Sequence, residues 1–256
     1  MNFRANTIDT FSDLLLDVAV LLISNGANST RTARNLTRVS DFFGYHIEYF
    51  FSHSAVVITI SDPESSESRT LVRRIPHYGV NYSIISAISI LTWEISEGDY
   101  ATTDDVEEKL RQISQDHSYS EWFKFVMIGI ATAALSKIFG GTHLEFVIAF
   151  LAGMFGIIVR KLFLERHFNV NICWFIGAFV STSVVNCFRL MGMQDYHAAL
   201  TACVLWLIPG VPLINGFLDI FSGHVVSGWA KVSMGLLMVF MIAVGFYLSI
   251  FVFGYG

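Results

Sequence analysis

The chain contains 256 residues, of which 54% are hydrophobic, and its formal net charge is -5. Its mean hydropathy is +0.56, and it has no block of Lys and Arg, which argues against nucleic acid as a partner because phosphate neutralisation requires clustered cations. Residues 1–120 carry 9 Lys+Arg and 16 Asp+Glu, whereas residues 121–256 carry only 7 and 5. Apolar stretches with so few charges can each span a bilayer, which takes about 20 residues. The sequence therefore predicts a soluble α+β head domain at residues 1–120 and an α-helical polytopic membrane domain at residues 121–256.

Two helices are predicted at the start of the chain. Between Thr7 and Asn25, apolar residues recur at helical spacing, and another face carries three aspartates, Asp9, Asp13 and Asp17. Gly26 ends this helix, and Ser29 or Thr30 is expected to cap a second helix that runs to about Phe43, before Gly44. One face of the second helix carries three arginines that are expected to face an acidic neighbourhood: Arg31, Arg34 and Arg38.

Three short runs rich in aromatic and β-branched residues follow, and they predict a small antiparallel sheet. The runs are Tyr45–Phe51, Ala55–Ser61 and Thr70–Ile75. Helical spacing returns over Asn81–Ser96, and Thr102 with Asp105 is expected to begin a last, charged helix. The head is thus predicted to have the element order ααβββαα.

Five membrane-spanning helices are predicted in the second part of the chain: Trp122–Phe139, Leu144–Leu164, Ile172–Leu190, Tyr196–Phe221 and Val225–Phe253. The end of the second span and the loop between it and the third are rich in basic residues, namely Arg160, Lys161 and Arg166. The positive-inside rule then places the head and this loop in the cytosol. An odd number of spans leaves the C-terminus, Gly254-Tyr255-Gly256, on the outside.

The second and third spans carry small residues four positions apart, as in Ala149-Gly153, Ala152-Gly156 and Gly177-Ser181. Such rows allow helix backbones to approach closely, with or without a role in transport. The third span also has a polar face, which can bind a solute or only join helices. That face consists of Ser181, Thr182, Ser183 and Asn186.

The fourth span contains Pro209, Gly210 and Pro212 in its middle. Prolines remove backbone donors and open a helix, and the bilayer tolerates the freed carbonyl groups only where they face protein or a watery cavity. Many transporters use such a discontinuous helix to present half-helix ends to a small charged solute. The sequence therefore predicts part of a translocation site here, with a passive kink as the alternative.

Asp219, in the same span, is the foremost candidate for chemistry because an ionisable side chain inside a membrane is costly. We expect it to carry a proton or to pair with a cation, and Lys231 in the next span is a candidate partner. The alternative is a solvated carboxylate at the cytosolic interface. Asn215 lies one helical turn before Asp219 and joins the predicted site.

Two motifs carry a family resemblance: Leu22–Thr32 (LISNGANSTRT) in the head, and Pro209–Leu213 (PGVPL) followed by Asn215, Asp219, Gly223 and Gly228. Through them nearly the whole chain resembles the ThrE-type threonine/serine exporter family, and within it the YjjP-like split-exporter subunits associated with succinate export. Lys231 stands where this resemblance leads us to expect an arginine.

The resemblance implies a subunit of a bacterial inner-membrane exporter. Full-length exporters of the family join such a unit to a second membrane unit, so a separate short membrane partner and an oligomer are implied. The expected solute is a small carboxylate metabolite, either threonine or serine or a dicarboxylate such as succinate. The helix N-terminus after Pro209-Gly210 would attract its carboxylate, and Asp219 would change protonation in a proton-driven cycle. Four cations are eligible as charge partners: Lys231, Arg189, Lys137 and Arg160.

Two other functions are less consistent with the sequence than export. A hydrolytic or metal site on His46, His53 and His77 matches no HExxH or zinc spacing. A sensing or assembly head on a membrane anchor would need only one apolar helix. No GxxxxGK[ST] motif occurs, so direct coupling to ATP is not expected. No cofactor is predicted, and the chain is predicted to be a transporter subunit rather than an enzyme.

Overall fold

The computed structural model describes residues 8–65, 67–75, 79–100, 102–115 and 119–254, and within them it contains ten helices and three strands. The chain divides into two compact units. The first unit combines Met1–His117 with Val211–Ser233, and the second combines Ser118–Gly210 with Met234–Gly256. The segment that follows the proline-rich break thus belongs to the same compact unit as the N-terminal elements.

The N-terminal elements of the first unit are α1 (Ile8–Ser24), α2 (Ser29–Phe43), β1 (His46–Phe51), β2 (Ala55–Ser61), β3 (Ser68–Arg74), α3 (Tyr82–Glu97) and α4 (Thr103–Ser114). Their order confirms the predicted ααβββαα pattern. Most of α9 (Gly210–Phe221) and the first turns of α10 (Val225–Phe253) complete this unit.

The capping residues at the helix ends agree with the sequence at two positions and differ at one. Gly44 adopts the left-handed conformation, with φ 78°, and Thr102 caps α4 by accepting a hydrogen bond from the Asp105 N–H, both as predicted. The predicted cap of α2 is wrong by one residue, because the Asn28 side chain accepts from the Arg31 N–H at 2.7 Å. Ser29 is therefore the first residue of α2, and its own N–H is available to another acceptor.

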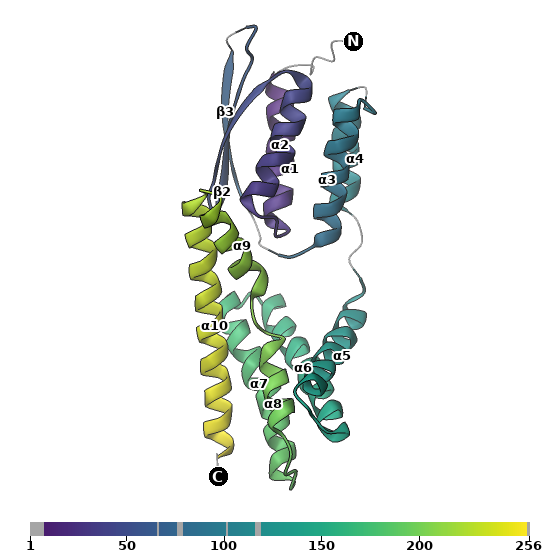
Figure 1. The fold of residues 1–256 in the computed structure, drawn as a ribbon, viewed down its shortest axis with the longest axis vertical. Coiled ribbons are helices and arrows are strands. Elements are labelled where there is room, and N and C mark those ends of the chain that lie inside the picture. The colour runs from purple at the N-terminus through teal and green to yellow at the C-terminus, as the bar shows by residue number, and fades with distance from the viewer. Residues whose placement is uncertain (1–7, 66, 76–78, 101, 116–118, 255–256) are drawn as a thin grey trace. The chain divides into compact units, whose positions relative to one another are not determined.

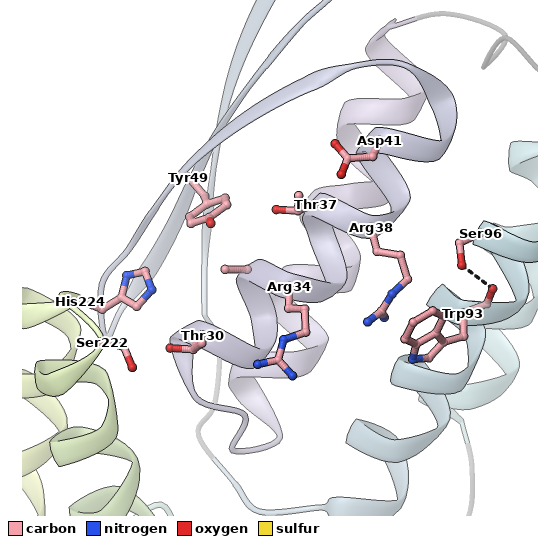
Figure 2. A pocket seen from close by; sticks show the side chains of 11 residues that line it. Thr30, Arg34, Thr37, Arg38, Asp41, Tyr49, Trp93, Ser96, Ser222 and His224 are labelled. Carbon is pink, nitrogen blue, oxygen red and sulfur yellow. Dashed lines mark hydrogen bonds between the residues drawn. The ribbon is translucent and has the colours of Figure 1, made fainter.

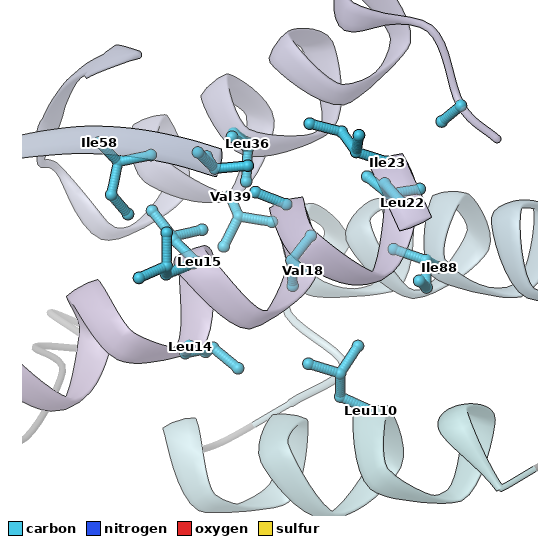
Figure 3. Packing of buried hydrophobic residues seen from close by; sticks show 14 of the residues in the cluster. Leu14, Leu15, Val18, Leu22, Ile23, Leu36, Val39, Ile58, Ile88 and Leu110 are labelled. Atoms are coloured by element: carbon cyan, nitrogen blue, oxygen red, sulfur yellow. The ribbon is translucent and has the colours of Figure 1, made fainter. Parts of the chain in front are cut away.

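The three strands form the predicted antiparallel sheet, with β2 in the centre and Ile47 opposite Ile60. Helices α1 and α2 lie between this sheet and the pair α3 and α4 (Figure 1). Apolar residues of α1 are buried on several sides, against Leu36 and Val39 of α2, Ile58 of β2, Ile88 of α3 and Leu110 of α4 (Figure 3). The aspartate face of α1 pairs with β3, where Arg69 contacts Asp9 and Arg73 contacts Asp13 and Asp17.

The second unit contains α5 (Glu121–Ile138), α6 (His143–Glu165), α7 (Val170–Leu190), α8 (His197–Leu205) and the remainder of α10. Small residues allow these helices to pack closely, as the sequence predicts. A Cβ on Gly153 would overlap the side chain of Thr132, and a Cβ on Gly156 would overlap that of Ser181. These glycines are thus positions of helix contact.

Among the described residues, three helices are long and apolar enough to cross a membrane, namely α6, α7 and α10, and a fourth span is obtained if the bent pair of α8 and α9 counts as one. In α10 only 22% of the most apolar window is buried inside the protein, so most of its apolar surface requires lipid or another chain as a neighbour. The predicted count of five is not confirmed, because the 18 residues of α5 contain three charged side chains, Glu121, Lys124 and Lys137.

Candidate functional site

The predicted fourth span is broken. Helix α8 ends at Leu205, α9 begins at Gly210, and the two are bent by 54°. Pro212 lies in the first turn of α9, where a missing N–H leaves no hydrogen bond unmade. The discontinuous helix predicted from Pro209, Gly210 and Pro212 is therefore present, and its part in translocation remains a prediction.

Asp219 of α9 is buried in a polar cluster of the first unit. Its Oδ1 accepts from the Ser29 backbone N–H at 2.8 Å, and its Oδ2 accepts from Ser29 Oγ at 2.7 Å, Ser227 Oγ at 3.1 Å and Lys231 Nζ at 2.7 Å. Asp219 is 0% exposed and Lys231 is 1% exposed. The expected ion pair is thus present, and the alternative of a solvated carboxylate is wrong.

Local structure explains how the four groups of this cluster meet. Ser29 opens α2, so the carboxylate lies where the partial positive charge of the helix N-terminus stabilises an anion. Ser227 and Lys231 are four residues apart and therefore share one face of α10. Helices α9 and α10 approach closely at two glycines, since a Cβ on Gly228 would lie 2.6 Å from the Gly216 carbonyl oxygen.

Asn215 extends the contact between α9 and the start of α2. Its Nδ2 donates to the Gly26 carbonyl oxygen at 2.7 Å, one helical turn before Asp219. The two motifs singled out in the sequence, Leu22–Thr32 and Pro209–Leu213 with its following polar residues, therefore touch each other. Sequence reasoning missed Ser29 and Ser227 as partners of Asp219, because it assigned Ser29 to the capping of its own helix.

The cations predicted as charge partners have different surroundings. Lys231 is paired with Asp219, Lys137 donates to the Gly141 carbonyl oxygen at 3.0 Å, and Arg189 donates to the carbonyl oxygens of Phe253 and Gly254. Arg160 makes no hydrogen bond or ion pair with the described residues, and its buried Nε lacks an acceptor. Its guanidinium lies 3.6 Å from the ring centroid of Trp174 in α7.

Other donors near Arg160 are also buried without a partner among the described residues. They are Trp174 Nε1, Trp206 Nε1 and Ser181 Oγ. Arg160 and Leu207 both lie against Gly177, and Trp174 and Trp206 both pack on the apolar cluster that contains Leu207. Buried donors are normally satisfied. This region of the second unit, beside the residues that follow α8, is therefore suited to an acceptor from outside the chain.

Arg160 also lines a cavity of about 240 Å³ between α5 and α6. Two further cations line it, Lys124 and Lys161, and both are paired with the carboxylate of Glu121. The lining therefore contains three cations and one carboxylate. Its volume is below the range of about 300–1,000 Å³ typical of drug-sized ligands, which limits an occupant to a small solute.

The polar face of α7 serves partly to join helices. Ser183 Oγ lies 2.9 Å from Ser249 Oγ of α10, and Asn186 Nδ2 donates to the same Ser249 Oγ at 3.2 Å. Thr182 Oγ1 lies 4.0 Å from Cys203 Sγ of α8. Asn186 Oδ1 has no partner among the described residues, so Asn186 retains capacity for a donor.

Glu145 is a buried carboxylate that sequence reasoning missed. Its Oε2 accepts from the Thr142 N–H at 2.8 Å, and its Oε1 accepts from the N–H groups of Ala198 and Ala199 at 2.9 and 3.3 Å. It thereby caps both its own helix, α6, and the start of α8. The Thr142-x-x-Glu145 spacing of a capping box was the available signal.

Of the three histidines proposed for the rival enzymatic site, the two that the structure describes do not lie together. His46 begins β1 and His53 follows its end, so a strand of six residues, about 20 Å long, separates them. His77 lies outside the described residues. Within the part of the chain that the structure describes, no group of three His, Cys, Asp or Glu side chains could hold a metal ion.

Comparison with known proteins agrees with a membrane exporter. The family model described as "Putative threonine/serine exporter" matches residues 13–253. A "Probable succinate transporter subunit YjjP" of Klebsiella aerogenes is 28% identical over 246 residues, covering 94% of this chain and 93% of that protein. The protein of the same name from Escherichia coli K12 is 26% identical, covering 94% of each chain.

A longer relative is also similar. A "Probable threonine/serine exporter" of Mycobacterium tuberculosis is 21% identical, and the similarity covers 93% of this chain but 45% of that protein. No solved structure matches the chain. The family and these relatives are described as exporters or transporters, not as enzymes.

Proposed function

Because the chain belongs to the threonine/serine exporter family, we propose that it is one subunit of an exporter for a small carboxylate metabolite, either threonine or serine or a dicarboxylate such as succinate. The names of its relatives supply both solute classes. The observation that carries the proposal is Arg160 in α6, one of the helices able to span a membrane: it is partly buried, and its buried Nε has no acceptor among the described residues.

A partly buried cation without a counter-ion is unfavourable, so an anion bound at Arg160 would be stabilised. A guanidinium forms two parallel hydrogen bonds with a carboxylate, which orients the solute as well as binding it. Trp174 supports the guanidinium from one side through a cation–π contact. In this proposal Arg160 holds the solute carboxylate, and the neighbouring indole N–H groups are further donors.

The broken helix and Asp219 have separate roles in the proposal. The N-terminus of α9, just after Pro209, favours an anion through its oriented N–H groups. Protonation of Asp219 would remove the ion pair with Lys231 and one or more hydrogen bonds to Ser29 and Ser227. Proton movement would thereby alter the contact between α9 and α2, and a proton gradient could drive efflux. Thr182 and Asn186 of α7 are proposed to assist the solute.

The finer arrangement in the membrane is part of the same proposal. The head faces the cytosol, α5 counts as a fifth span, and the C-terminus lies outside. A second, head-less membrane subunit completes the exporter, and the complex is an oligomer. The lengths of the similar proteins support a second subunit. The similarity covers 93% of a protein that is itself named a subunit, but only 45% of the longer exporter.

The test replaces Arg160 and follows efflux of labelled succinate, threonine and serine from cells that contain the chain and its partner. We expect Arg160→Gln to lower the efflux rate of the transported solute about tenfold or more, because a hydrogen bond to a charged group contributes roughly 1.5–3 kcal/mol. The matched control is Arg166→Gln, which removes the same charge from an exposed side chain just beyond α6. Unchanged efflux in a folded Arg160→Gln protein would contradict the proposed role of Arg160.

A further inference from the structure

A second positively charged site lies on α2 in the first unit. Two adjoining cavities, of about 630 and about 390 Å³, open beside this helix and share four lining residues, Thr30, Arg34, Arg38 and Trp93. Arg31 lines the smaller cavity. Figure 2 shows Arg38 extending from α2 towards Trp93 of α3, with Arg34 one turn earlier on α2.

The three arginines have only neutral partners among the described residues. Arg31 donates through Nε and Nη2 to Ser89 Oγ at 3.3 and 3.1 Å. Arg38 Nη1 donates to Asn35 Oδ1 at 3.0 Å and to Thr92 Oγ1 at 2.7 Å, and its guanidinium carbon lies 3.9 Å from the Trp93 ring centroid. Arg34 makes no hydrogen bond or ion pair within the described ranges. The prediction that these arginines face an acidic neighbourhood is therefore wrong.

The uncompensated charge of these arginines contrasts with the charges between α1 and β3. There, the aspartates of α1 are matched by Arg69 and Arg73 of β3. Beside α2, Asp41 is the one carboxylate that lines the larger cavity among the described residues, and it forms no ion pair with the arginines. Burial, followed by the like charge of Arg34, lowers the pKa of Arg38. An anion in the cavity would relieve both unfavourable effects.

We propose that these cavities bind a small organic anion with two or more carboxylate or phosphate groups, held by Arg31, Arg34 and Arg38. Three positive charges less the one of Asp41 leave a surplus of two, which a dianion neutralises. The larger cavity falls within the range of about 300–1,000 Å³ used for small-molecule sites. Neutral hydrogen bonds hold Arg31 and Arg38 in place beforehand, so little ordering is needed on binding.

The site adjoins the Asp219 cluster along the chain. Thr30 lines both cavities and follows Ser29, which donates twice to Asp219. Ser222 and His224 line the larger cavity and connect α9 to α10. A bound anion would thus contact both segments that the Asp219 cluster joins, which makes the site regulatory. The inference does not depend on solute binding at Arg160.

The experiment is a calorimetric titration of the purified full-length chain carrying Arg160→Gln, so that the proposed solute site does not contribute. Succinate, pyrophosphate and ATP are the separate probes, and they distinguish carboxylate from phosphate recognition. We expect saturable binding of at least one probe, weakened by salt, and a further Arg34→Gln change should weaken it about tenfold or more. Arg34→Gln should not affect folding, because this side chain has no partner in the described structure.

The matched control is Arg74→Gln, which removes the same charge from an exposed residue of β3 outside both cavities. It should leave the affinity unchanged. The inference is overturned if no probe binds at millimolar concentration, if Arg34→Gln has no effect, or if Arg74→Gln weakens binding as much as Arg34→Gln. Binding seen only when Arg160 is intact would also overturn it, without contradicting solute export.

Discussion

Asp219 and Lys231 depend on each other because neither side chain has access to water. Asp219→Asn keeps the shape of the side chain but leaves Lys231 buried without a counter-ion. We expect a loss of about 3–5 kcal/mol in the free energy of unfolding, as when one partner of a buried pair is removed. We also expect loss of efflux. Thermal unfolding of the purified chain and efflux of labelled solute measure the two effects separately.

A double variant separates structure from mechanism at this pair. Replacing both partners by apolar residues, Asp219→Leu with Lys231→Met, removes both charges and should recover the stability lost through the unpaired Lys231, but not that of the hydrogen bonds from Ser29 and Ser227. If Asp219 carries protons, efflux stays absent in the double variant despite its recovered stability. Recovery of efflux together with stability would show that the pair has only a structural role.

His53 predicts a pH dependence of stability in the first unit. Burial, followed by the positive charge of Lys231, lowers its pKa from 6.5. The unfolded chain therefore takes up a proton at a higher pH than the folded chain, so stability falls as the pH drops below 6.5 and continues to fall until the folded form is also protonated. Above that window the residue contributes no pH dependence.

The measurement is the unfolding temperature of the full chain between about pH 7.5 and pH 5.5. His53→Gln should lose less stability over this interval than the unmodified chain. His46→Gln, at an exposed position on β1, is the control and should retain the original dependence. If the unfolding temperature depends on pH equally in the unmodified chain, His53→Gln and His46→Gln, His53 makes no contribution.

The pair of Asp219 and Lys231 could be predicted because charged residues are rare in apolar segments and attract attention. The partners Ser29 and Ser227 could not be predicted, because serines are frequent. In addition, a separation of 190 positions between Ser29 and Asp219 leaves no local pattern. Arg160 was one of four eligible cations by sequence. The structure distinguishes it, because the other three cations have partners whereas Arg160 has no acceptor among the described residues.

At the scale of elements, close helix packing in the second unit gives a sharp test. Gly153 of α6 has no room for a side chain, because a Cβ would overlap Thr132 of α5. Gly153→Leu should therefore separate α5 from α6 and reduce the yield of folded protein severely, since overpacking costs about 1–3 kcal/mol or more. Ala131→Leu, at an exposed position on α5, should be tolerated. Equal yields would contradict close packing of α5 on α6.

Element identities were predictable where local chemistry decides them. The order ααβββαα followed from spacing and turn residues, and the break between α8 and α9 followed from Pro209 and Gly210. The cap of α2 was misplaced by one residue because Asn28, Ser29 and Thr30 all favour that position. Helix α5 was expected to be a span from its apolar centre, but the charges at its two ends leave it outside the set that qualifies by composition.

At the scale of the whole molecule, hydropathy alone could not predict that Val211–Ser233 belongs to the first unit. The segment is apolar, and its polar residues find partners far away in the sequence, on α2 and at Gly26. Helix α10 has 29 residues, which at about 1.5 Å per residue is about 43 Å long. A hydrocarbon core of about 30 Å leaves about 13 Å of helix, or about two turns, outside it, so the first turns of α10 can hold Lys231 in a polar cluster while the rest is long enough to cross the membrane.

The length of the chain relative to its relatives leads to the last prediction, which concerns the second subunit. If the chain is half of a split exporter, proteoliposomes that contain it alone should release labelled succinate, threonine and serine no faster than empty liposomes. Adding a second, head-less membrane protein of the same family should restore release, and the two proteins should purify together. Arg166→Gln should behave like the unmodified chain in the same assay. Full release by the chain alone would contradict the split arrangement while leaving export itself intact, because oligomers of this chain would then supply the whole pathway.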